Sequence, residues 1–180
     1  MPSPWPSSAN LLPGDELLSP AGGPYDTLEE VIGIRESKCS LKEYGVTYAQ
    51  ADLKPDGTFD YDAIREKING RTKLITIQRS KGYATRPSFS VRQIGELIAF
   101  CKGIKPDVKI MVDNCYGEFV ETIEPSDLGA DMVVAASSRT PAEDLPPSAA
   151  TSAAPRSAWT GVPTGSPPRD WAKRWVPTWV

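Results

Sequence analysis

Short apolar, strand-like runs alternate with helical segments along residues 11–134, and this alternation most constrains the fold. Three of the runs are nearly continuous apolar stretches, at Lys73–Ile77, Asp107–Val112 and Ala130–Val134. Strands that are buried on both faces have this pattern, whereas strands with one solvated face alternate apolar and polar residues. The sequence therefore predicts an α/β domain with a mostly parallel sheet flanked by helices.

The segments between these runs carry the signals of helices and of further strands. Val46–Ala51 has the β-branched and aromatic content of a strand, and Asp15–Ser19 is a short apolar stretch. Three helices are expected, each beginning at a residue whose side chain can cap a helix N-terminus: Asp26 or Thr27, Asp60, and Ser90. We expect ligands of such a sheet to bind at the carboxyl ends of its strands.

The two ends of the chain differ in composition from its middle. All five Trp lie in residues 1–10 or 135–180, and the second of these segments also holds eight of the 18 Pro. Neither segment has a helical or strand period. We therefore expect a foreign segment at 1–10, a domain at 11–134 and a tail without regular structure at 135–180.

Composition excludes several classes of function. The chain has no His, so Ser-His-Asp and Cys-His catalysis and the usual zinc sites are excluded. A net charge of −3 gives no basic footprint for nucleic acid, and no apolar run approaches the length of a membrane helix. The three Cys fit reduced thiols, with Cys101 packed in a helix. We expect a cytoplasmic protein.

A carboxylate at the end of a buried strand is the strongest local signal. Asp113 directly follows the run Asp107–Val112. A carboxylate in a desolvated position is useful when a cation pairs with it, and the protonated ring nitrogen of pyridoxal phosphate (PLP) is one such cation. The alternative is that Asp113 caps the following turn together with Asn114. The residues alone leave both interpretations open.

Two weaker signals also follow strand ends. Gly22 and Gly23 lead to Tyr25, which suits close approach of a ligand and stacking on a flat ring, although such a glycine pair is more often only a turn. Arg79 and Lys81 follow the run Lys73–Ile77 and suit a carboxylate or phosphate, although a solvated basic loop is the commoner explanation.

Together these stretches resemble the aluminium resistance protein family, also described as methionine gamma-lyase-like or cystathionine lyase-like. The resemblance rests on Leu17–Gly33, Ile77–Ala84 and Met111–Glu121 and covers about residues 11–134. It implies a fold-type I PLP enzyme of the aspartate aminotransferase superfamily, and residues 11–134 would be part of its PLP-binding large domain. It also implies an amino-acid substrate and a homo-oligomer.

The resemblance further implies roles for nine residues. Asp113 would pair with the pyridine nitrogen and Tyr25 would stack on the ring. The remaining residues of the cofactor site would be Gly22, Gly23 and Cys115. The residues that line the substrate site would be Arg79, Ser80, Lys81 and Tyr116.

Two elements of the family differ in this chain. A Ser-Gly-Thr-His segment, which holds the cofactor phosphate, does not precede the first matched stretch, and Arg139 stands where the family has its Schiff-base lysine. A guanidinium stays protonated and cannot form the imine. We therefore expect a fragment of a PLP-dependent carbon–sulfur lyase-like enzyme acting on a sulfur amino acid, inactive as written, with weak or no PLP binding and with its assembly left open. The alternative is a non-enzymatic α/β interaction module whose Trp-rich tail binds a partner.

A shifted reading frame would account for both unusual ends. Synonymous codons can be chosen for residues 135–145 that, read with one extra base in front, encode Gly-Ser-Leu-Ile-Lys-Asn-Pro-Gly-Gly-Gly-Leu, which is the family's lysine loop. A similar choice for residues 1–9, read one base earlier, encodes His-Ala-Ile-Ala-Leu-Ala-Leu-Phe-Gly. We predict that the underlying nucleotide sequence, read in the neighbouring frame, encodes this loop after Val134. Stop codons in that frame, or unrelated words, would refute the hypothesis.

Overall fold

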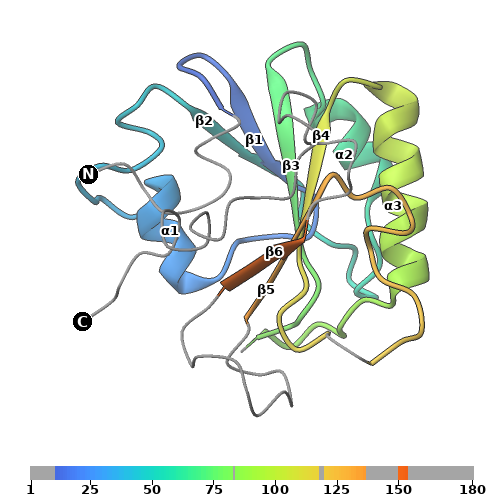
Figure 1. Ribbon diagram of the computed structural model, residues 1–180. Helices are drawn as coiled ribbons and strands as arrows, with labels where there is room; N and C mark the ends of the chain where they lie inside the picture. Colours follow the sequence, from blue (N-terminus) through green and yellow to red (C-terminus); the bar gives the residue numbers. More distant parts are fainter. Residues whose placement is uncertain (1–10, 83, 118–119, 137–149, 154–180) are drawn as a thin grey trace, which may run out of the picture.

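The computed structural model describes residues 11–82, 84–117, 120–136 and 150–153, which form a six-stranded sheet with helices against it (Figure 1). The elements in chain order are β1 (Glu16–Ser19), α1 (Asp26–Ile32), β2 (Thr47–Gln50), α2 (Tyr61–Lys67), β3 (Thr72–Gln78), α3 (Val91–Ile104), β4 (Lys109–Asp113), β5 (Met132–Ala136) and β6 (Ala150–Ala153). The strand order is β2-β1-β3-β4-β5-β6. All neighbours pair in parallel except β5 and β6, which are antiparallel. The predicted α/β fold with a mostly parallel sheet is confirmed.

The three segments expected from the sequence can be compared with the positions of the strands and helices. The segment 11–134, which we expect to be a domain, contains the first four strands and all three described helices, and β5 extends two residues beyond it. Within residues 135–180, for which the sequence predicted no regular structure, β6 pairs its backbone with β5. The segment 1–10, Arg139 and the Trp-rich end lie outside the described residues.

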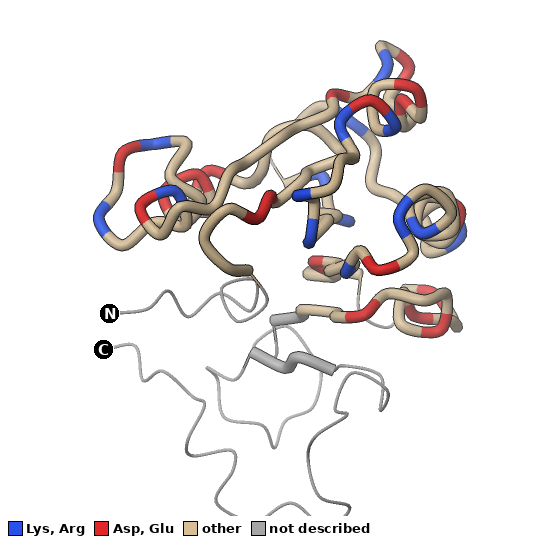
Figure 2. Tube along the Cα trace, turned by 90° about the horizontal axis from the view of Figure 1, so that it is seen from above, with Lys and Arg blue, Asp and Glu red and all other residues tan. Residues whose placement is uncertain are grey.

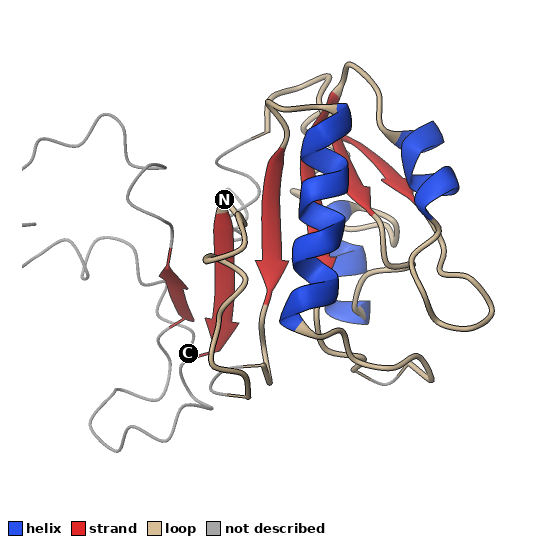
Figure 3. Ribbon diagram, turned by 90° about the vertical axis from the view of Figure 1, so that its right-hand side faces the viewer, coloured by secondary structure: helices blue, strands red, loops and turns tan. Residues whose placement is uncertain are grey.

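The helices cover both faces of the sheet, and successive strand residues point to opposite faces. On one face α2 and α3 pack on a core that includes Leu18, Ile75 and Ile110, and Figure 3 shows α3 running alongside the strands in front of the sheet. On the other face Ile32 of α1 packs with a second cluster that includes Met111. Because both faces are buried, the central strands have no solvated side. This is why their sequences are continuous apolar runs.

The helix boundaries follow capping chemistry, with one difference from the sequence prediction. The Asp60 carboxylate accepts hydrogen bonds from the amides of the first turn of α2, and Ser90 forms a reciprocal capping box with Gln93, as these residue types predict. The expected cap of α1 by Asp26 or Thr27 is wrong. Tyr25 is the N-cap and no side chain caps the helix; the carboxylate of Asp26 accepts instead from the adjacent amide of Thr27.

Charged residues of both signs are interspersed over the helices and loops, as Figure 2 shows. Several are paired across short distances. At the amino end of β4, for example, Asp131 lies 3.0 Å from Lys102 Nζ and 3.3 Å from Lys109 Nζ. Among the described helices, none is long and apolar enough to cross a membrane.

We predict that Ser90→Ala lowers the free energy of unfolding by about 1 kcal/mol, because the amide of Gln93 loses its acceptor. Ser90→Thr is the matched control, since its hydroxyl keeps the capping oxygen. Urea denaturation of the three proteins measures the effect. An equal loss in both variants would show that the cap does not set the stability of α3.

Candidate functional site

The parallel register brings two polar side chains together at the carboxyl ends of neighbouring strands. Gln78 of β3 pairs with Asp113 of β4. Leu74 and Met111, four and two residues earlier in the same strands, belong to the core cluster beneath α1. Because side chains alternate along a strand, Gln78 and Asp113 also project toward the α1 face. The helix α1 begins at this end of the sheet, so its first residues lie near both side chains.

Tyr25 joins this end of the sheet through its backbone. Its amide donates to Oε1 of Gln78 at 3.1 Å. Its ring forms part of the wall of a hollow of about 290 Å³. The other residues that line the hollow are Ser80, Lys81, Gly82, Ser88 and Tyr116. The structure therefore brings together four of the residues for which the sequence predicted a role at the cofactor or substrate.

A second hollow of about 380 Å³ shares Ser80, Ser88 and Tyr116 with the first. Its wall also includes Cys115 and Glu121. Cys115 is half-buried, whereas Tyr116 is 63% exposed and has a left-handed backbone with φ of 68°. The two hollows are therefore neighbouring parts of one concave rim, formed by the loops that follow β3 and β4.

Asp113, the last residue of β4, is half-buried and is not among the residues that line either hollow. Its Oδ1 accepts a hydrogen bond from the amide of Cys115 at 3.1 Å, which is the turn-capping contact that the sequence left open. Among the residues that the structure describes, no Lys or Arg forms an ion pair with this carboxylate. Capping of the turn does not engage the whole carboxylate, so the contact with Cys115 is compatible with a further cationic partner.

The glycine pair lies beside the end of β2 and is not among the residues that line either hollow. Gly22 has φ of 84°, which favours glycine, and its carbonyl accepts from the Ser19 hydroxyl at 2.7 Å. The amide of Gly22 donates to the Ala51 carbonyl at 2.9 Å. Nearby, burial raises the pKa of Tyr48 to about 12, so its hydroxyl stays protonated and donates to Gln50. The observed contacts of the pair are those of a turn that leads the chain to Tyr25.

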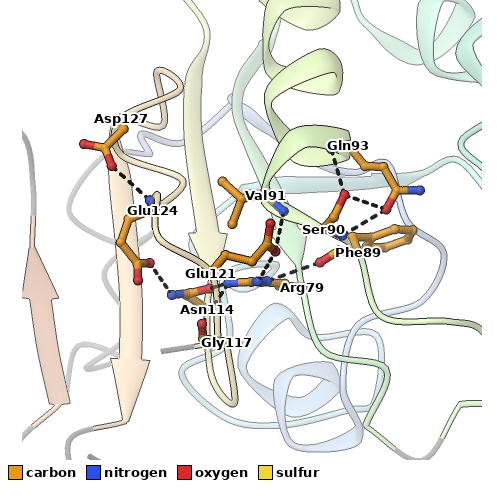
Figure 4. Close-up of polar contacts among 10 residues, drawn as sticks. All are labelled: Arg79, Phe89, Ser90, Val91, Gln93, Asn114, Gly117, Glu121, Glu124 and Asp127. Carbon is orange, nitrogen blue, oxygen red and sulfur yellow. Dashed lines mark hydrogen bonds and ion pairs between the residues drawn. The ribbon is translucent and has the colours of Figure 1, made fainter. Parts of the chain in front are cut away.

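Arg79 is buried, with 5% of its surface exposed, and its guanidinium donates hydrogen bonds to other groups of the chain (Figure 4). The acceptors are the Phe89 carbonyl at 3.2 Å, Asn114 Oδ1 at 2.7 Å, the Gly117 carbonyl at 2.9 Å and Glu121 Oε1 at 2.6 Å. Although Arg79 is also part of the wall of the second hollow, its donors are directed to these groups. The arginine therefore connects the loop after β3 to the loop after β4.

Glu121 and Glu124 also take part in this network, a role that the sequence did not predict for either residue. Glu121 also accepts from the amide of Val91 at 2.9 Å, at the start of α3. Asn114 is 2% exposed and donates to Glu124 at 2.8 Å. These acidic residues are 42 and 10 positions away from their partners Arg79 and Asn114, so no local period could have identified the contacts.

Arg86, in the same loop as Arg79, also binds backbone carbonyl groups of the chain. It donates to the carbonyls of Gln78 at 2.9 Å and Ser80 at 2.7 Å, and its guanidinium lies 4.5 Å from the centre of the Phe89 ring. Burial lowers its pKa, but an arginine remains charged at neutral pH. With Arg79 and Arg86 engaged in this way, the exposed Lys81 is the basic side chain in the wall of the first hollow.

Comparison with known proteins identifies the family. The sequence profile of methionine gamma-lyase matches residues 7–145. The chain belongs to the methionine gamma-lyase family. The family match and the fold confirm the resemblance that the sequence suggested. Cystathionine lyases and aminotransferases with this fold are PLP-dependent.

Individual relatives agree with the family match. The chain is 51% identical over 137 residues to the Bacillus subtilis protein YnbB, covering 75% of this chain and 32% of YnbB. It is similar to the crystal structure of a carbon-sulfur lyase involved in aluminum resistance from Clostridium novyi, with 43% identity, a TM-score of 0.65, and coverage of 69% and 30%. An alanine aminotransferase from Pyrococcus furiosus, at 25% identity, TM-score 0.50 and coverage of 71% and 31%, shares the fold. The chain spans about a third of the length of these proteins.

We predict that Arg79→Lys lowers the free energy of unfolding by about 3 kcal/mol. Arg79 reaches its four acceptors from three nitrogen atoms, whereas the single nitrogen of a lysine carries three donors and leaves buried polar groups unpaired. Arg92→Lys is the matched control: Arg92 is 85% exposed and pairs with Glu96 one turn away, so a change below about 0.5 kcal/mol is expected. Thermal or urea unfolding measures both. Similar losses in the two variants would contradict a structural role for Arg79.

Proposed function

We propose that this chain contains part of the cofactor site of a PLP-dependent carbon–sulfur lyase-like enzyme that acts on a sulfur amino acid. The observation that carries the proposal is the arrangement of Asp113 and Tyr25 at one end of the sheet and toward the same face. Gln78 connects them, since it pairs with Asp113 across the strands and accepts from the Tyr25 amide.

The chemistry of these residues fits PLP. A half-buried carboxylate without an Arg or Lys partner among the described residues suits a protonated pyridine nitrogen, and the Tyr25 ring suits a flat aromatic group. When bound, PLP supplies an electron sink for the carbanion formed at the substrate α-carbon. In this proposal Asp113 keeps the ring nitrogen protonated, Tyr25 orients the ring, and Cys115 fixes the carboxylate through its amide. Gly22 and Gly23 contribute by placing Tyr25.

For the substrate we propose the first hollow. Lys81 offers a cation to the carboxylate of an amino acid, and Ser80 and Tyr116 offer hydroxyl groups beside it. Arg79 would act on this site indirectly, by shaping the loop that carries Tyr116. We also propose a homo-oligomer for the whole enzyme, as the family resemblance implies.

The chain as written should turn over no substrate, because Arg139 takes the place of the lysine that attaches the cofactor covalently. It should bind PLP weakly and without covalent attachment. The interaction-module alternative rests on the Trp-rich segment, and no contact of the described residues favours it.

A lysine substitution tests the proposal. We predict that Arg139→Lys gains a visible absorbance band after PLP addition that survives dialysis, and that borohydride fixes the cofactor at residue 139. The unchanged chain should show neither effect. Ser138→Lys is the matched control, since it adds the same side chain one position away. Borohydride-fixed cofactor at one specific lysine of the unchanged chain would contradict the proposed loss of the attachment site.

A further inference from the structure

The backbone of Gly82 lies directly against the ring of Tyr25. A methyl group on Gly82 would overlap ring atoms Cε2 and Cδ2 and would approach Cζ to 3.3 Å. The φ of Gly82 is 55°, a left-handed conformation that side chains disfavour. Both the conformation and the space therefore require glycine here. Gly82 and Tyr25 belong to the wall of the same hollow, so their contact determines the shape of that wall.

The side chain of Gln78 joins the two segments that meet at this contact. Its Oε1 accepts from the amide of Tyr25 at 3.1 Å, and its Nε2 donates to the carbonyl of Ser80 at 3.4 Å. One amide group at the end of β3 thus connects the start of α1 to the loop that contains Gly82. Tyr25 and Gln78 are 53 positions apart in the sequence, so this connection exists only in the folded chain.

The other side of the loop is also fixed. Arg86 donates to the carbonyls of Gln78 and Ser80 from a single nitrogen, so residues 78–80 have a defined path before the chain reaches Gly82. Side-chain hydrogen bonds therefore fix the backbone up to Ser80, two residues before Gly82. Since Gln78 fixes the backbone of Tyr25 to the same strand end, the ring and Gly82 are positioned from one common point.

We propose that Gln78 and Gly82 are positioning residues that fix the ring of Tyr25 as the aromatic wall of the first hollow. Gln78 fixes the backbone on which the ring is carried, and Gly82 limits how far the ring can turn. The role as support for a bound flat ring rests on the proposed function; the position of the Tyr25 ring itself does not.

Fluorine NMR of the full chain labelled with 3-fluorotyrosine tests the inference, with the Tyr25 signal assigned by its loss in Tyr25→Phe. Gly82→Ala and Gln78→Leu should each move or broaden this signal. Gly14→Ala is the matched control, because Gly14 has a φ of 97° but nothing within 4 Å of an added methyl group. A Tyr25 signal that stays unchanged in Gly82→Ala, or that moves equally in Gly14→Ala, would overturn the inference.

A titration with PLP separates this inference from the proposed function. In the unchanged chain PLP should move the Tyr25 signal, and in Gly82→Ala about tenfold more PLP should be needed for half of the change, corresponding to about 1.4 kcal/mol. An affinity equal to that of the unchanged chain would overturn the supporting role of Gly82. If PLP moves the Tyr25 signal in no variant while Gly82→Ala still moves it, the positioning of the ring stands and the proposed function fails.

Discussion

The parallel pairing of β3 with β4 is the constraint on which the described site depends. Its register places Gln78 beside Asp113 at the ends of the two strands. From these positions one side chain reaches the start of α1 and the other caps the turn after β4. A shift of one residue in either strand would turn its polar side chain to the opposite face and its apolar residues out of their core clusters. The burial of the apolar residues therefore also fixes the positions of the polar ones.

The loops at this end of the sheet are joined to each other by internal hydrogen bonds. Arg79 satisfies acceptors on both loops, and a buried guanidinium stabilises only when its donors are matched. Gly117 lies so close to this guanidinium and to Asn114 that a side chain at position 117 would collide with both. The cost of burying a charge is thus offset by a network that holds the path of the loop. Arg79 and Arg86 are thus occupied by contacts within the chain, whereas Lys81 is exposed and lines the first hollow.

Much of the fold could be predicted because its signals are local. The continuous apolar runs of β3, β4 and β5 reflect burial on both faces, and Ser90 caps its helix through residues three positions away. The site was predictable as a set of strand-end residues, and Tyr25, Ser80, Lys81 and Tyr116 do share a hollow. The contacts that hold the site were not predictable. Those of Gln78 with Tyr25 and of Arg79 with Asn114 span 53 and 35 positions, and α1 begins without the expected side-chain cap.

The central claim is that Asp113 and Tyr25 form part of a site for a pyridine ring. The most direct measurement is the titration of the ¹⁵N-labelled chain with pyridoxamine 5′-phosphate, which carries an amine in place of the aldehyde and so cannot attach to a lysine. The account predicts saturable shifts of the amide signals of Tyr25, Gly82 and Cys115, with those of Glu16 and Ile110 at the opposite end of the sheet unchanged. Shifts at the opposite end of the sheet, or no saturable shift of these three signals, would contradict it.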